Sequence, residues 1–264
     1  VIESVKNLRL NLRHPPGDHL LVLIPCVTET VDISNFINNY NLAPLLDSVN
    51  CKELRLFIEI LNQEETEALV RAMTSRVEIL RLVLHMEFEM DYHTFSMYEG
   101  DGKCREVHIA NYSEYDMSSL LDSVNCKELH LFTGTKKLSQ DETEALVRAM
   151  TTSVEIVHLG SMDDDFVDKV ALDFDTLTKY KGDGKCREVH CNSVCIGWSK
   201  FDTLYDYCDF DEDDHENLIS CSESYVYGMK DMWLNEEGAE NWAGQMNWDL
   251  RVKNQDCEFV LSRK

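Results

Sequence analysis

Six basic or titratable side chains occupy one position of a short segment that recurs along the chain. Each lies at the fifth position of an apolar-x-x-apolar-x-apolar pattern. Four of them are histidines, which titrate close to neutral pH. If the segments are parallel strands stacked side by side, these side chains form a column with neighbours about 4.8 Å apart. We call this set the polar column, and its members are Arg55, Arg81, His108, His130, His158 and His190.

Acidic and aromatic residues recur beside the polar column. Glu53, Glu106, Glu128 and Glu188 hold the third position of their segments, and Phe57 and Phe132 hold the exposed seventh position, where they can anchor a partner. We expect the carboxylates to favour protonated imidazole and neighbouring imidazolium ions to repel one another, so that binding depends on pH. The alternative is that duplication of one ancestral unit copied these residues, which then only form ion pairs on a solvated face.

Catalysis and metal binding find little support in the sequence. G-x-S-x-G, P-loop, H-E-x-x-H and G-x-G-x-x-G motifs are all absent, so we expect neither an enzyme nor a cofactor. The acidic stretch 209–213 resembles the start of a calcium loop, but Asp214 and Ser220 replace the required glycine and glutamate. The run 163–165 is read as a solvated acidic loop. His190, Cys191, Cys195 and Cys208 lie in one region and are possible zinc ligands, but the paired C-x-x-C motif of a structural zinc site is absent. We therefore expect no metal.

An internal duplication defines the elements that position the polar column. Three blocks occur twice in the same order, which indicates a repeat architecture. The blocks are LLDSVNCKEL(R/H)LF at 45–57 and 120–132, ETEALVRAM at 65–73 and 142–150, and Y(E/K)GDGKCREV at 98–107 and 180–189.

Each long repeat contains several strand-like segments separated by helical signals. Segments of the apolar pattern recur every 22–32 residues, with cysteine or valine first, starting at Cys51, Val77, Cys104, Cys126, Val154 and Cys186. We expect positions one, four and six to be buried, so the four cysteines act as small hydrophobes. Ser139 and Glu142 predict a capping box, and Asn62 opens the equivalent helix. Shorter helices are predicted over 42–49 and 120–124.

The repeated blocks resemble the leucine-rich-repeat superfamily in its ribonuclease-inhibitor-like form, over residues 31–193. They are similar to C-terminal repeats of invertebrate NACHT or death-fold innate-immune receptors. The resemblance implies an α/β solenoid, a horseshoe with parallel concave strands and outer helices. It departs from the usual pattern where cysteine or valine replaces leucine and where the asparagine after the strand is absent.

The two ends differ from the repeats. Residues 1–30 are interpreted as a hairpin cap or as degenerate first repeats. Residues 194–264 are interpreted as an irregular capping region, with strands predicted over 249–253 and 258–262 and a helix over 237–246. The alternative is an aromatic binding surface, because this region holds all four tryptophans: Trp198, Trp233, Trp242 and Trp248.

The net charge and the composition limit the classes of partner and the compartment that the sequence predicts. A formal charge of −24 disfavours nucleic acid and makes a basic protein the easier partner. No apolar run approaches the roughly 20 residues of a membrane span. Buried cysteines favour a reducing compartment, hence the cytoplasm, and the Val-Ile-Glu start indicates a fragment that can self-associate through an uncapped edge.

The sequence thus predicts a non-enzymatic protein-recognition module, the sensing or regulatory part of an innate-immune receptor. Two alternatives remain. One is an acidic inhibitor or adaptor that wraps a basic protein. The other is a lipid or glycan sensor that uses the tryptophan-rich C-terminal region.

Overall fold

One ten-stranded sheet organises the molecule. The computed structural model describes residues 5–12, 18–35, 41–84, 88–111, 115–133, 138–159, 171–172, 174–177, 179–192, 195–196, 243–254 and 258–264. The first eight strands of the sheet pair in parallel, and the last two join it antiparallel. In sheet order they are β1 (Val5–Asn11), β2 (Val27–Asn35), β3 (Glu53–Ile58), β5 (Ile79–Leu84), β7 (Glu106–Asn111), β8 (Glu128–Phe132), β9 (Ile156–Leu159), β11 (Glu188–Asn192), β14 (Glu258–Arg263) and β13 (Trp248–Asn254).

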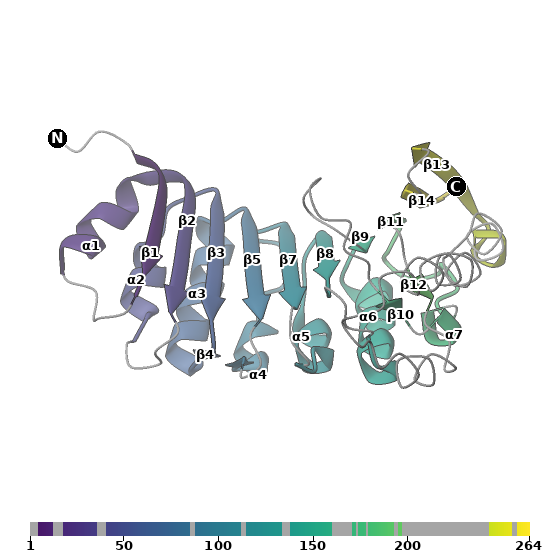
Figure 1. Cartoon of the computed structure of the whole chain (residues 1–264), viewed down its shortest axis with the longest axis horizontal. Coiled ribbons are helices and arrows are strands. Elements are labelled where there is room, and N and C mark those ends of the chain that lie inside the picture. The colour runs from purple at the N-terminus through teal and green to yellow at the C-terminus, as the bar shows by residue number, and fades with distance from the viewer. Residues whose placement is uncertain are drawn as a thin grey trace, which may run out of the picture.

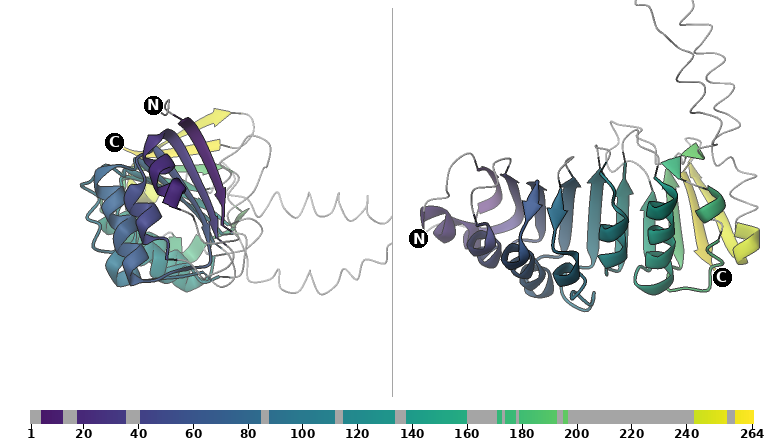
Figure 2. Two further views of the ribbon diagram at one scale, coloured as in Figure 1. Left: turned by 90° about the vertical axis from the view of Figure 1, so that its left-hand side faces the viewer. Right: turned by 90° about the horizontal axis from the view of Figure 1, so that it is seen from below.

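Helices cover one face of this open sheet (Figures 1 and 2). They connect successive parallel strands, which cannot be joined by tight turns. The helices are α1 (Asp18–Leu23), η1 (Ile24–Cys26), α2 (Ala43–Ser48), α3 (Gln63–Ser75), α4 (Tyr92–Phe95), α5 (Ser118–Ser123), α6 (Gln140–Thr152) and α7 (Phe174–Leu177). Two small parallel pairs lie outside the main sheet: β4 (Ile60–Leu61) with β6 (Glu89–Met90), and β10 (Ala171–Leu172) with β12 (Cys195–Ile196). The described part of the chain contains no helix long and apolar enough to cross a membrane.

The core lies between the sheet and the helices, where the repeat pattern predicts it. In β3 the first, fourth and sixth positions are Cys51, Leu54 and Leu56, which are at most 2% exposed. The intervening side chains point to the opposite face, because strand side chains alternate. The same three positions are buried in the segments that start at Val77, Cys104, Cys126 and Val154, and the first and fourth positions, Cys186 and Val189, are buried in the last segment. The predicted burial pattern is therefore confirmed.

The four repeat cysteines are buried and reduced. Each thiol donates a hydrogen bond to the carbonyl oxygen two residues later, at Sγ–O distances of 3.0–3.6 Å. Burial raises the pKa of Cys51 to about 11 and the pKa values of Cys104 and Cys186 to about 12. Burial also raises the pKa of Cys126. These thiols therefore pack as small hydrophobes, as the sequence predicts.

Two buried glutamates join neighbouring helices. Glu142 closes the predicted capping box with Ser139: each side chain accepts from the other's backbone N–H. Its second carboxylate oxygen accepts from the backbone N–H of Met117, at the start of α5. Glu65 makes the equivalent contacts at the start of α3, with Asn62 and with Leu42 of the preceding unit. One side chain thus caps its own helix and fixes the preceding helix.

The G-D-G turns of the third block bring two backbone segments into contact. Gly100 has φ +73°, a conformation that L residues rarely adopt. A Cβ on Gly102 would lie 2.6 Å from Thr74 Cα, and a Cβ on Gly184 would lie 2.4 Å from Thr151 Cα. The turns therefore pack directly on the backbone at the C-terminal ends of α3 and α6. Moving this backbone to make room for a side chain would cost free energy.

We expect Gly102→Ala and Gly184→Ala each to lower the free energy of unfolding by about 1–3 kcal/mol, the usual cost of overpacking. Gly244 is the matched control, because an added Cβ there meets nothing within 4 Å and residues 243–246 are helical. Gly244→Ala should be neutral or stabilising by up to about 1 kcal/mol. Urea unfolding followed by circular dichroism measures all three. Equal effects would show that the turns do not constrain the fold.

The ends of the sheet differ in strand direction. β1 and β2 pair in parallel, so the predicted N-terminal hairpin is wrong, and the degenerate repeat stays a prediction. At the other end β13 and β14 confirm the two predicted strands and form a hairpin against β11. Of the predicted helix 237–246, the structure describes residues 243–246, which are helical. Trp198, Trp233 and Trp242 lie outside the described residues.

Candidate functional site

The register of the parallel strands assembles the polar column as predicted. Arg55 pairs with Arg81, Arg81 with His108, and each histidine with the next along the sheet. The helices cover one face of the sheet (Figure 2), and strand alternation places the column side chains on the other face, which we call the open strand face. The column also extends toward the N-terminus, where Asp32 pairs in register with Arg55.

The four histidines form a continuous stack of imidazole rings. The ring centroids of His108 and His130 are 4.0 Å apart, as are those of His130 and His158, with interplanar angles of 3° and 2°. His158 and His190 follow at 4.2 Å and 23°. Strand spacing sets the ring separation, because each ring projects from one strand at one register position. The sequence predicts the column, and the structure adds its face-to-face geometry.

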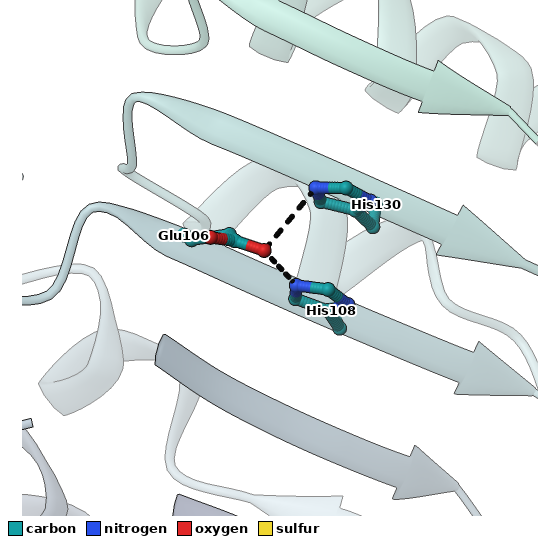
Figure 3. A group of neighbouring side chains, drawn as sticks. All are labelled: Glu106, His108 and His130. Carbon is teal, nitrogen blue, oxygen red and sulfur yellow. Dashed lines mark hydrogen bonds and ion pairs between the residues drawn. The ribbon is translucent and has the colours of Figure 1, made fainter. Parts of the chain in front are cut away.

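Glu106 and Glu128 each contact column residues of two successive strands. Glu106 Oε1 contacts His108 Nε2 and lies 3.4 Å from His130 Nε2 (Figure 3). Glu128 Oε1 lies 3.0 Å from His130 Nε2 and 2.8 Å from His158 Nε2. The carboxylates therefore connect neighbouring strands through the imidazoles.

Glutamates also contact the polar column at both ends of the histidine stack. Glu53 Oε1 pairs with Arg55 Nε at 2.8 Å and also with Arg81 of the next strand. Glu188 Oε2 lies 3.1 Å from His190 Nε2. All four predicted glutamates thus contact the polar column.

The charge state of the central histidines differs from the sequence expectation. Burial, with the neighbouring His108, Arg81 and His190, lowers the pKa of His130 to about 3, although Glu106 opposes the shift. Burial and the neighbouring histidines likewise lower the pKa of His158 to about 4, against the opposing effect of Glu128. The glutamates do favour protonation, as expected, but desolvation and the neighbouring basic groups outweigh them, so the expected titration near neutral pH is wrong for these two rings. These two rings are neutral at pH 7.

We expect the free energy of unfolding to fall as the pH drops from about 6.5 to 5. In this window the unfolded chain protonates His130 and His158 while the folded chain, with lowered pKa values, does not. The loss is at most about 1.4 kcal/mol per pH unit for each histidine. Carboxylates titrate mainly below this window.

Urea unfolding between pH 7 and 5, with a chelator present, measures this loss. The double variant His130→Gln, His158→Gln should show a shallower pH dependence than the wild type. Identical slopes in the two proteins would contradict the assignment of neutral central histidines.

The two predicted aromatic anchors differ in exposure. Phe57 is 36% exposed and available on the open strand face. Phe132 is only 5% exposed, so its expected role as an exposed anchor is wrong. Phe132 ends β8, and Thr133 after it is also buried, so the chain covers this strand end. Equivalent sequence positions at the ends of strands therefore need not share an environment.

A groove beside the polar column was not predicted from the sequence. It has a volume of about 770 Å³ and lies where the amino ends of β5, β7 and β8 meet the first G-D-G turn. Basic side chains line it together with acids that include Glu78 and Asp101. The basic residues are Lys52, Lys103, Arg105, Lys127 and Arg187. Four of these hold the second position of the repeat, which was the sequence signal for this groove.

Two groups of column residues have the composition of a metal site. They are Glu106, His108 and His130, and Glu128, His130 and His158. The metal candidates considered from the sequence alone, 209–213, 163–165 and Cys208, lie outside the described residues, as do the side chains of Cys191 and Cys195.

No protein-family model matches the chain, and no curated protein sequence or solved structure matches it. The fold and the open strand face define a class: a mixed α/β protein with an open, mostly parallel sheet, helices on one face and a titratable polar column on the other.

Proposed function

We propose that the chain is a leucine-rich-repeat recognition module that binds a protein partner on the open strand face. The observation that carries the proposal is the polar column, which repeats in register on the face that the connecting helices leave open. A strand and a helix that recur every 22–32 residues, stacked only on neighbours, also support this assignment.

The open strand face offers polar and apolar contacts. The basic groove lies beside the column, and Arg55 and Phe57 are exposed near its N-terminal end, with the Arg55 side chain 45% exposed. Because strands and core fix these groups, a partner meets a preformed surface with little ordering cost. Charges of both signs line the groove, and such charges contribute more to the choice of partner than to the affinity itself.

Membership of a larger innate-immune receptor is the biological setting we propose, on the resemblance of the three repeated blocks to such receptors. The acidic inhibitor of a basic protein is the second candidate, supported by the net charge of −24. We do not propose the lipid or glycan sensor, because Trp248 is 4% exposed and the other three tryptophans lie outside the described residues.

The test compares two variants with matched charge changes. The strand-face variant carries Arg55→Glu, Arg105→Glu and Arg187→Glu. The helix-face variant carries Arg71→Glu, Arg148→Glu and Lys179→Glu. All six side chains are exposed, and both variants change the net charge equally. Partners are captured from the source tissue, purified, and their Kd values measured against each folded variant.

We expect the strand-face variant to bind at least about tenfold more weakly, a loss of about 1.4 kcal/mol, and the helix-face variant to bind as the wild type does. Equal affinities would contradict binding on the open strand face. A steep fall in affinity with added salt would favour the basic-protein inhibitor.

A further inference from the structure

The centre of the polar column brings together ligand atoms of the kind that hold transition metals. In the first group, one oxygen of Glu106 and one ring nitrogen each of His108 and His130 lie within 4.8 Å of one another. Figure 3 shows that the carboxylate oxygen faces both imidazole nitrogens across the two strands. The second group repeats this arrangement one strand later, with Glu128, His130 and His158.

The ligand set favours zinc over calcium or magnesium. Imidazole nitrogen and carboxylate oxygen suit zinc and similar divalent transition metals, whereas calcium and magnesium prefer oxygen ligands alone. Tetrahedral zinc with ligands at about 2.1 Å needs donor atoms about 3.4 Å apart. Small rotations of the imidazole and carboxylate groups bring atoms within 4.8 Å to that spacing.

The electrostatic surroundings also suit a cation. Glu106, Glu128 and Glu188 line the four-histidine stack, and a chain of charge −24 concentrates cations near its surface. Arg81 is the opposing cation, and it is paired with Glu53.

The site is accessible from the open strand face. The side chains of Glu106 and Glu128 are 28% and 31% exposed, and His130 and His158 are 17% and 27% exposed. Three protein ligands leave the fourth position of a tetrahedral ion for water or for a group from a bound molecule.

We infer that the polar column binds one Zn²⁺ per chain, held by His130 together with either Glu106 and His108 or Glu128 and His158. His130 belongs to both groups, so an ion in one excludes an ion from the other. This inference does not depend on the protein-recognition proposal, and its test uses no partner.

Calorimetric titration of the full chain with Zn²⁺ tests the inference. We expect one equivalent to bind with a Kd of about 10 µM or tighter. His130→Ala removes the shared ligand and should weaken binding by at least about tenfold. His93→Ala is the matched control, because His93 is an exposed histidine in α4, outside the column, and its loss should change nothing.

A second variant separates ligand loss from misfolding. Glu106→Gln with Glu128→Gln keeps the side-chain shapes and should also weaken zinc binding by at least about tenfold, while circular dichroism stays unchanged. The absorption spectrum of the Co²⁺ form should show tetrahedral bands without the intense near-ultraviolet bands of thiolate ligands. The inference is overturned by zinc binding that both variants retain, by thiolate bands, or by no binding at about 100 µM Zn²⁺.

Discussion

Replacing Glu142 with alanine will lower the free energy of unfolding by about 2–4 kcal/mol. The carboxylate is 0% exposed and accepts from the backbone N–H groups of Met117 and Ser139. Each buried donor left without an acceptor costs about 1–3 kcal/mol. Because Met117 starts the neighbouring helix, the loss affects two helices at once. Denaturant unfolding at pH 7 measures the change.

Two further variants make the Glu142 experiment specific. Glu142→Gln keeps one acceptor oxygen but turns an amide NH₂ toward the other N–H, so we expect an intermediate loss. Asp141→Ala removes an exposed charge in the same first helical turn and should cost no more than about 1 kcal/mol. If Asp141→Ala and Glu142→Ala cost the same, helix-terminal charge explains the effect and the connection between helices does not.

Replacing Trp248 with alanine will destabilise the C-terminal end of the sheet by about 3–5 kcal/mol. The indole is 4% exposed and packs edge-on against Tyr180, with ring centroids 6.1 Å apart. It also lies directly against the second G-D-G turn, since a Cβ on Gly182 would come within 2.5 Å of the indole nitrogen. The side chain therefore covers the last apolar edge of the stacked repeats, an edge that a repeat protein must protect.

Hydrogen exchange locates the effect of Trp248→Ala. Protection should fall most in β11 and α6 and least in β3, because each unit contacts only its neighbours. Asp249→Ala, next in sequence but exposed and paired only loosely with Lys264 at 3.6 Å, should leave exchange unchanged. A uniform loss of protection along the whole sheet would instead mean that the molecule unfolds as one cooperative unit.

The strand register could be predicted from the sequence because one polar position recurs in six apolar segments. A slip of one residue would turn Leu54 and Leu56 out of the core, so burial fixes the face on which each residue lies, and the recurring polar position then indicates which residues lie side by side. The capping box could also be predicted from the sequence, since Ser139 and Glu142 have the required spacing. The spacing of residues and the alternation of apolar and polar positions were therefore enough to predict the strands of the sheet and the polar column.

Properties that depend on distances between strands could not be predicted in this way. Proximity of opposite charge suggested protonated histidines, whereas the extent of burial decides the pKa of His130. The burial of Phe132 depends on how the chain covers the end of β8. The shared contacts of Glu106 and Glu128, and the metal groups they create, appear only when neighbouring side chains have positions in space.

The labelling rates of the four repeat cysteines can report local opening of the sheet. One buried thiol lies just before each of β3, β7, β8 and β11, hydrogen-bonded to backbone and held far from its reactive thiolate form. An alkylating reagent can reach such a sulfur only while its own unit is open. The labelling rates of Cys51, Cys104, Cys126 and Cys186 therefore record, unit by unit, how often each part of the native sheet opens, and no cysteine needs to be introduced by mutation.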